Sequence, residues 1–337
     1  MSRRSKSLIT GATGMVGSHL IDYLLNYTED DIIALIRWRS PLDNLRMALS
    51  SPESKRIKFI YADIRDPHAL DAQFSKHKFD FVYHLAAQSF PQVSFDSPAE
   101  TLETNVTGTA NVLESLRKYS PEAIMHVCSS SEVFGRVPKE FVPIAEDTPF
   151  HPASPYAISK VGTDLLGRYY AEAYGLNIQI TRMFTHTGPR RGDVFAESTF
   201  AKQIAMAEAG LKDKTIFVGN LDSMRTIADV RDAVRAYHLL LTHNPLKGTT
   251  YNIGGNHSLT VGDILDFLIK QSRTVGLKVE IDPDRLRPID ADLQIPDTSK
   301  FRSHTGWKPT INFEKTLTDL LDYWRDEIAR GRVVMNR

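Results

Sequence analysis

Short apolar runs alternate with amphipathic stretches through the first half of the chain. Between the runs, residues 17–27, 109–119 and 156–175 place apolar side chains at helical spacing, and the last stretch ends at Gly175. A run that is apolar throughout is typical of a strand buried on both faces of a parallel sheet. Strands are therefore predicted at 7–10, 32–36, 57–62, 81–87, 123–130 and 177–184.

This alternation predicts an α/β fold with a doubly wound parallel sheet, the Rossmann arrangement, and right-handed crossovers. The second half of the chain is less regular. It has the short strand patterns "KTIFVG" and "TTYNIGG" and helical patterns near 196–210, 228–243, 260–275 and 313–330. We expect it to form a smaller, mixed α/β lobe over the carboxyl ends of the sheet strands, where ligands bind in such folds.

Three glycines, Gly11, Gly14 and Gly17, lie between the first predicted strand and the first predicted helix. At this place Gly11 makes the tight turn, Gly14 lets a pyrophosphate approach the backbone, and Gly17 lets helix and strand pack closely. The amino end of the helix also favours negative charge. A glycine-rich turn alone binds nothing, but its position in this fold predicts a dinucleotide site.

Arginines follow the second predicted strand, where NAD sites usually carry a carboxylate for the ribose. Arg37 and Arg39 suit a 2′-phosphate, so NADP is the expected cofactor, although each could instead belong to an exposed basic loop. We accordingly assign 1–185 and 217–256 to an NADP-binding Rossmann domain. The remaining residues, 186–216 and 257–337, are assigned to a substrate-binding lobe.

Two further motifs carry candidate chemistry. "SPYAISK" places Tyr156 and Lys160 four residues apart, on one face of a helix, where the ammonium favours the phenolate and makes it a usable base. "HVCSSSEVFG" ends a predicted strand in hydroxyls and a carboxylate, and that strand end faces the same crevice as the cofactor. Taken singly, these motifs are also typical of a helix surface pair and of a polar loop.

Composition narrows the range of partners and compartments. The 337 residues include 41 Lys and Arg against 41 Asp and Glu, so no overall charge attracts nucleic acid or an anionic membrane. Cys128 is the only cysteine, which excludes an internal disulfide and a thiolate cluster for metal. No apolar run approaches the length of a membrane span, and no metal site is expected. These features predict a cytoplasmic protein that recognises a small ligand.

The motifs "TGATGMVGSHL", "ADIRD", "HLAAQS", "CSSSEVFG" and "SPYAISK", in this order, resemble the nucleotide-sugar branch of the extended short-chain dehydrogenases/reductases. The resemblance continues through "RMFTHTGPRRGD", "VGNLDSMRTIADVRDAV" and "LRPIDADL", nearly to the end of the chain. It implies a nicotinamide cofactor and a nucleotide-diphosphate sugar as substrate.

The resemblance also implies roles for individual residues. Tyr156 is the acid/base, Lys160 holds the nicotinamide ribose, Ser130 bonds the reacting sugar oxygen, and Glu132 removes the C5 proton in 4,6-dehydratases. The cofactor residues, with Tyr156 and Lys160, are Gly11, Thr13, Gly14, Met15, Val16, Gly17, Arg37, Arg39, Asp63, Ile64, Leu85, Ala86 and Ala87. The substrate residues are Gln88, Ser89, Ser130, Thr185, Arg191, Val218, Asn220, Arg225 and Arg287.

Within this branch the chain is most similar to GDP-mannose 4,6-dehydratases, through Arg37, "GPRRGD" and "RPIDADL". It departs from them at Thr185, where they have asparagine, and at Phe90 in a substrate-facing loop. "FAKQI" and Asn105 are more similar to GDP-4-keto-6-deoxymannose reductases. A redox-neutral dehydratase is the favoured interpretation. An NADPH-dependent reductase or epimerase of a 4-keto sugar nucleotide, and a non-catalytic NADP sensor, stay open.

Assembly is the last expectation. In the family that the chain resembles, amphipathic helices like those around 100–118 and 156–174 form a four-helix interface, which implies a homodimer or homotetramer. In its tetrameric members an arginine-containing loop reaches a neighbouring subunit's cofactor, a role that would fall here to Arg190 and Arg191.

Overall fold

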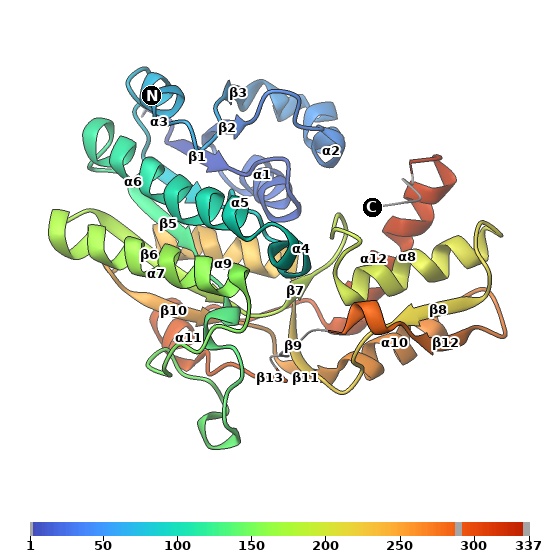
Figure 1. Ribbon diagram of the computed structural model, residues 1–337. Coiled ribbons are helices and arrows are strands. Elements are labelled where there is room, and N and C mark those ends of the chain that lie inside the picture. The colour runs from blue at the N-terminus through green and yellow to red at the C-terminus, as the bar shows by residue number, and fades with distance from the viewer. Residues whose placement is uncertain (1–2, 287–291, 333–337) are drawn as a thin grey trace.

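A seven-stranded parallel sheet forms the larger lobe of the computed structural model, which describes residues 3–286 and 292–332 (Figure 1). Its strands follow the spatial order β10-β6-β5-β4-β1-β2-β3, and every neighbouring pair is parallel. All six apolar runs of the first half form strands: the five inner ones are buried at nearly every position, whereas the edge strand β3 exposes Lys58 and Tyr61. The strands are β1 (Lys6–Thr10), β2 (Asp31–Ile36), β3 (Ile57–Tyr61), β4 (Phe81–His84), β5 (Ile124–Cys128), β6 (Asn177–Met183) and β10 (Thr250–Ile253).

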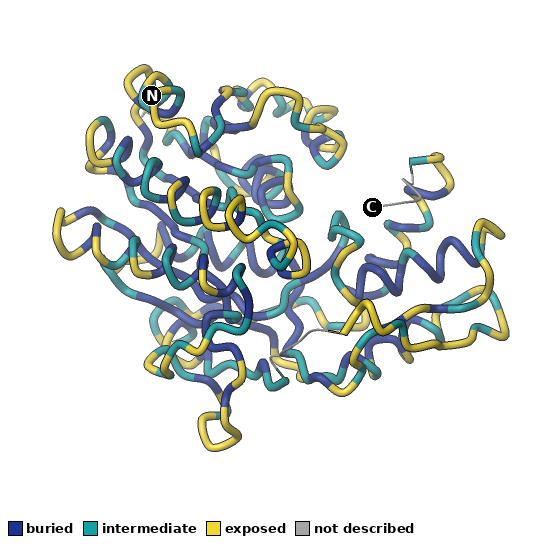
Figure 2. Tube along the Cα trace, viewed as in Figure 1, coloured by how far each residue is buried: buried dark blue, intermediate teal, exposed yellow. Residues whose placement is uncertain are grey.

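Helices cover both faces of this sheet, which confirms the doubly wound fold. One apolar core lies between the sheet and α1 (Met15–Tyr27), α9 (Val230–Thr242) and α11 (Ser299–Thr305). The core on the other face lies under α3 (Pro67–Phe74), α6 (Gly108–Tyr119) and α7 (Pro155–Tyr174). Figure 2 shows the central strands and the inward sides of these helices buried, with exposed residues on the outer surfaces.

The strand order reverses at the centre of the sheet. The chain winds from β1 through β2 to β3 in one direction, then crosses to β4 and continues through β5 and β6 in the other. Loops at the carboxyl ends of β1 and β4 therefore diverge and leave a crevice, which is where ligands bind in open α/β sheets.

A smaller lobe lies beyond these carboxyl ends (Figure 1). Strands β11, β9 and β13 form one sheet, to which β7 adds by pairing with β9, and β8 pairs with β12. Helix α8 packs against α10 and α12 around a separate apolar core. The elements are β7 (His186–Thr187), α8 (Ala196–Glu208), β8 (Thr215–Val218), β9 (Met224–Asp229), β11 (His257–Thr260), α10 (Val261–Lys270), β12 (Lys278–Ile281), β13 (Leu293–Gln294) and α12 (Phe313–Ala329).

The smaller, mixed lobe is thus confirmed, whereas its exact limits in sequence stay a prediction. Helix α9 and β10 accompany the large sheet, but β9 belongs to the small one, so the chain passes between the lobes more than once. Three short helices complete the fold: α2 (Arg46–Ser50), α4 (Pro91–Asp96) and α5 (Pro98–Leu102). Among residues 3–286 and 292–332, no helix is long and apolar enough to cross a membrane.

A buried ion pair fixes the helix that carries "SPYAISK". Asp164 on α7 is fully buried, and its carboxylate accepts hydrogen bonds from Arg182 on β6, with Nε to Oδ2 at 2.8 Å. Arg182 also donates to the Glu146 carbonyl at 2.6 Å, so the guanidinium is satisfied. Paired and hydrogen-bonded in this way, the two charges are tolerated inside the core and hold α7 against the sheet.

Candidate active site

A single cavity of about 870 Å³ lies between the carboxyl ends of the large sheet and the smaller lobe. We call it the cleft. Its lining comes from the glycine-rich turn, the ends of β2, β4 and β5, the start of α7, and the segment between β6 and α8. Segments far apart in sequence therefore meet at one concave site, whose volume is in the range of cavities that bind small molecules.

The glycine-rich turn is shaped for a close approach to the backbone. Gly11 has φ +69°, and a Cβ there would lie 2.8 Å from the Ala86 nitrogen, while a Cβ on Gly17 would lie 2.3 Å from the Gly11 oxygen. Gly14 caps α1 without any side-chain hydrogen bond, and the first turn holds no acidic residue. The amino end of α1 is therefore free to bind an anion, so these residues fit a dinucleotide pyrophosphate.

Thr10 at the end of β1 holds the neighbouring wall of the cleft. Its Oγ1 accepts hydrogen bonds from the backbone N–H groups of Leu85 and Ala86, at 3.1 and 3.0 Å. His84 lies 3.0 Å from the same hydroxyl, and burial lowers the pKa of this histidine to about 3, so it is neutral. The stretch from Leu85 to Ala87 is thus fixed beside Gly11, as expected for a cofactor wall.

The outer end of the cleft carries two arginines and a carboxylate. Arg37 lines it, as does Asp63, whose carboxylate accepts hydrogen bonds from Arg65 at 3.1 Å (Nε) and 2.8 Å (Nη2). These bonds from Arg65 are the main reason that the pKa of Asp63 falls below its ordinary value. Arg65 was not singled out from the sequence. Arg39 is exposed, has φ +69°, and is not among the residues that line the cleft.

The candidate catalytic residues converge where β5 ends and α7 begins. Ser130 caps the short helix η4 (Ser131–Phe134) by accepting from the Glu132 N–H at 3.2 Å, and its hydroxyl lies near enough to that of Tyr156 to influence the pKa of the phenol. Lys160 lies one turn after Tyr156 and donates from Nζ to the Cys128 carbonyl at 2.7 Å. The four predicted residues Ser130, Glu132, Tyr156 and Lys160 all line the cleft.

Burial governs the electrostatics of this group. It raises the pKa of Tyr156 well above the ordinary range, and the nearby Ser130 hydroxyl and the charge of Arg191 act in the opposite direction. Burial also lowers the pKa of Lys160. A buried phenol and a buried ammonium side by side are suited to proton transfer, because small changes in nearby charge alter which of them is ionised.

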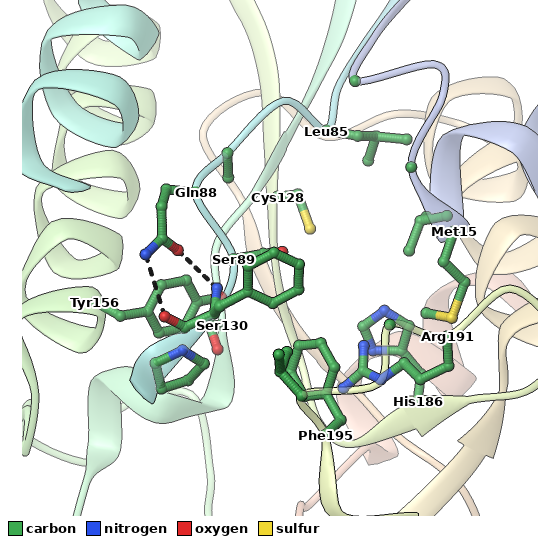
Figure 3. Close-up of a pocket in the computed structure, with 18 of the residues that line it drawn as sticks. Met15, Leu85, Gln88, Ser89, Cys128, Ser130, Tyr156, His186, Arg191 and Phe195 are labelled. Atoms are coloured by element: carbon green, nitrogen blue, oxygen red, sulfur yellow. Dashed lines mark hydrogen bonds between the residues drawn. The ribbon is translucent and has the colours of Figure 1, made fainter. Parts of the chain in front are cut away.

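The opposite wall belongs to the segment before α8. Figure 3 shows Tyr156 and Ser130 on one side of the cleft and Arg191 with His186 on the other. Arg191 Nε donates to Glu197 Oε1 at 3.2 Å, and its guanidinium carbon lies 3.3 Å from the ring centroid of Phe195. Burial, aided by the charge of Arg191, lowers the pKa of His186 to about 3.

Gln88 shapes the loop after β4 with its own side chain. Its Nε2 donates to the Phe90 carbonyl at 3.2 Å, and its Oε1 accepts from the Phe90 N–H at 2.6 Å (Figure 3). Buried Asn105 bonds both backbone groups of Gln88, at 2.8 and 2.9 Å, and donates to Ser159 Oγ on α7 at 2.8 Å. The amide of Gln88, predicted to bind substrate, is therefore engaged within the loop.

The cleft brings together most of the residues singled out from the sequence. Val218 is the exception in the smaller lobe, since it is fully buried in that lobe's core, and Arg287 lies outside the described residues. Arg190, expected at an assembly contact, forms an ion pair with Asp22 of its own chain at 2.7 Å. The predicted residues that line the cleft are Gly11, Thr13, Gly14, Met15, Val16, Gly17, Arg37, Asp63, Ile64, Leu85, Ala86, Ala87, Gln88, Ser89, Ser130, Glu132, Tyr156, Lys160, Thr185, Arg191, Asn220 and Arg225.

Sequence reasoning missed Phe195, Glu197 and Arg285, which also line the cleft. Phe195 caps α8 and Glu197 lies in its first turn, two and four residues after "RRGD". In the sequence, they were marked only by the start of a predicted helix close to an arginine pair. Arg285 lies two residues before the predicted Arg287.

Comparison with known proteins identifies the family. A family model described as GDP-mannose 4,6 dehydratase matches residues 8–320. GDP-mannose 4,6 dehydratase 1 of Arabidopsis thaliana is 34% identical, over 98% of this chain and 92% of its own length. GDP-6-deoxy-D-mannose reductase of Pseudomonas aeruginosa is 29% identical, over 95% of this chain and 97% of its own.

Two solved structures share the fold and were determined with nucleotides. RMD from Pseudomonas aeruginosa complexed with NADPH has a TM-score of 0.81 at 27% identity, covering 96% of this chain and 99% of that one. DesIV, a dTDP-glucose 4,6-dehydratase from Streptomyces venezuelae with NAD and TYD bound, has a TM-score of 0.81 at 26% identity, covering 96% and 98%. With the family model spanning nearly the whole chain, the protein belongs to the GDP-mannose 4,6-dehydratase family of extended short-chain dehydrogenases/reductases.

Proposed function

We propose that this enzyme is an NADP-dependent 4,6-dehydratase that converts GDP-mannose, or a close relative, into its 4-keto-6-deoxy form. The observation that carries the proposal is the position of Glu132. Its carboxylate lines the same cleft as Tyr156, close enough for its charge to act on the Tyr156 hydroxyl. A dehydratase needs such a second base beside the acid/base, whereas a simple alcohol dehydrogenase does not.

The chemistry divides between these side chains. Bound NADP supplies the position that accepts hydride from the sugar and returns it. Tyr156 takes the proton of the C4 hydroxyl while Ser130 bonds that oxygen. The ketone formed at C4 acidifies the C5 hydrogen, which Glu132 removes as the C6 hydroxyl leaves. Because Ser131 stands where glucose-type dehydratases carry an aspartate, Glu132 also returns a proton to the departing oxygen.

Although the net charge of the chain is zero, positively charged side chains in the cleft can bind an anionic substrate. Arg225 and Arg285 line the cleft on the side of the smaller lobe. We assign them to the diphosphate of the sugar nucleotide, since guanidinium groups pair well with phosphate oxygens.

Incubation with GDP-mannose tests this function. A dehydratase yields a 4-keto-6-deoxy product with no net change in reduced cofactor. A second candidate, reduction of a 4-keto-6-deoxy sugar nucleotide, is favoured by the similarity to the Pseudomonas aeruginosa reductase. That activity leaves GDP-mannose unchanged and consumes NADPH when the keto sugar is supplied. A cytoplasmic location stays an expectation from the sequence.

Cofactor choice is tested at Arg37. Replacing Arg37 by Asp should raise the dissociation constant for NADP about tenfold to a hundredfold, because a charge-assisted bond to the 2′-phosphate is lost. Binding of NAD should change by less than about threefold, since NAD lacks that phosphate. Titration of both dinucleotides by fluorescence measures the difference. Arg39→Asp is the matched control, because Arg39 does not line the cleft. Equal losses for the two cofactors at Arg37 would contradict the assignment.

Assembly is tested on the outer face of α7. Ile158, Leu165 and Tyr169 are about half exposed, at 51%, 50% and 54%, and lie on one side of that helix; Leu102 of α5 is exposed beside it. Such a face suits a second copy of the chain. We expect Leu165→Arg to convert a homodimer or homotetramer into smaller species by light scattering. Val275→Arg, at a residue 84% exposed in another part of the chain, should leave the mass unchanged. A monomeric wild type at micromolar concentration would refute the assembly.

A further inference from the structure

Arg191 occupies an unusual position for a residue expected only to bind substrate. It faces the cleft from the wall opposite Tyr156, so a sugar bound against Tyr156 lies between the two side chains (Figure 3). Only 14% of the Arg191 side chain is exposed. A guanidinium so far removed from bulk water exerts its charge on neighbouring groups with little screening.

Two residues at the start of α8 fix the orientation of Arg191. Glu197, itself buried, accepts from Nε at 3.2 Å, and the Phe195 ring stacks on the guanidinium plane at 3.3 Å. Within residues 3–286 and 292–332, Nη1 and Nη2 have no hydrogen-bond partner. The ion pair therefore uses one edge of the guanidinium and leaves the other edge to the cleft.

The charged and titratable groups around Tyr156 come from four elements. Lys160 on α7 has its ammonium 6.0 Å from the phenol ring centroid and donates to a backbone carbonyl. Glu132 on η4 and Cys128 on β5 raise the pKa of the Tyr156 hydroxyl, whereas Arg191 lowers it. Around Arg191 itself stand Glu197, Tyr156 and the neutral His186. Arg191 therefore opposes the negative charge of Glu132 across the site.

We propose that Arg191, held by Glu197 and Phe195, stabilises the Tyr156 phenolate from the far side of the bound sugar while a proton passes between the phenolate and the sugar hydroxyl. The proton moves from the sugar oxygen to the Tyr156 oxygen on oxidation and returns on reduction, so no further reactant is required. Arg191 is then a catalytic residue in addition to a substrate contact, and Glu197 and Phe195 are positioning residues. The inference rests on the proposed sugar oxidoreduction at Tyr156.

The pH dependence of kcat/KM tests the proposal. One side of this pH profile, which we call the Tyr156 limb, follows the ionisation of the Tyr156 hydroxyl. It should move about one pH unit higher in Arg191→Met, because the phenolate loses a stabilising cation. The direction is the same whether activity rises through this limb, as in a dehydratase, or falls, as in a reductase. Arg191→Lys keeps the charge and should restore the wild-type limb. Glu197→Gln removes the counter-charge and should move the limb lower.

The Tyr156 limb should shift in opposite directions in Arg191→Met and Glu197→Gln. If the two residues had only a structural role, the limb would stay in place in both variants or would shift in the same direction in both. Arg225→Met is the matched comparison: it removes another cleft arginine and should raise KM without displacing the limb. Unchanged limbs in Arg191→Met and Glu197→Gln, with cofactor binding intact, would overturn the proposal.

A measurement without substrate tests the inference on Arg191 independently of the proposed function. The ultraviolet titration of tyrosinate, taken as wild type minus Tyr156→Phe, reports the Tyr156 hydroxyl alone. If this difference titration shifts upward in Arg191→Met while no sugar nucleotide turns over, the electrostatic effect of Arg191 on the Tyr156 hydroxyl stands and the proposed function fails. If turnover is present and the difference titration does not shift, the inference fails and the function stands.

Discussion

Tyr156→Phe should reduce turnover of the sugar nucleotide by about a thousandfold, since general acid–base groups contribute on this scale. The substitution keeps the ring that packs in the cleft wall and removes only the hydroxyl that lies near Ser130. The fold and the affinity for NADP should therefore change little. Rapid mixing with GDP-mannose should show no transient absorbance of reduced nicotinamide, because proton removal from the C4 hydroxyl is blocked.

The matched control is Tyr27→Phe, at the exposed carboxyl end of α1 and outside the proposed assembly face. It should retain wild-type turnover. If Tyr156→Phe still formed reduced cofactor at a rate near that of the wild type, Tyr156 would not be the acid/base, and another residue of the cleft would have that role.

Glu132→Gln should separate the first half of the reaction from the second. The amide preserves the shape of the side chain but lacks the basicity that removal of the C5 proton requires. We expect exchange of the C5 hydrogen with solvent to fall by about a hundredfold or more. Oxidation at C4 should persist, so the enzyme should accumulate reduced cofactor together with a 4-keto sugar. Mass spectrometry in deuterated water and absorbance measure the two effects.

Glu140→Gln, at an exposed glutamate in the short helix η5 (Lys139–Phe141), is the control and should exchange C5 as the wild type does. Near-normal turnover in Glu132→Gln would argue against dehydration. Together with oxidation of NADPH by a 4-keto-6-deoxy sugar nucleotide, that result would make the enzyme a reductase.

The large sheet was predictable because its signals are local. Runs such as 32–36 are apolar at every position, and at so short a length that pattern is typical of a strand covered on both faces. The glycine-rich turn was predictable for the same reason. Gly11 has φ +69°, and a Cβ added there would lie within 3 Å of a backbone atom, so the turn accepts only glycine. A glycine at this position of the sequence therefore predicts the turn.

The fine structure of the cleft was not predictable, because it depends on contacts between distant segments. Nothing near Asp63 in the sequence shows that Arg65 turns back to hold its carboxylate. The use of the Gln88 amide to shape its own loop depends on Asn105, which lies 17 residues further along the chain. Likewise, the Phe195 ring meets Phe90 at 5.6 Å only because the smaller lobe folds over the large sheet.

Asn105 ties the loop at Gln88 to α7 at Ser159 by side-chain hydrogen bonds, and Ser159 in turn donates to the carbonyl of Tyr156 at 2.6 Å. It lies in η3 (Glu103–Thr107), the turn that follows α5 and its exposed Leu102. The surface proposed to join two copies is thus connected to Tyr156 through the hydrogen bonds of Asn105 and Ser159. Dilution that separates the copies would then loosen the site itself, and specific activity would depend on enzyme concentration.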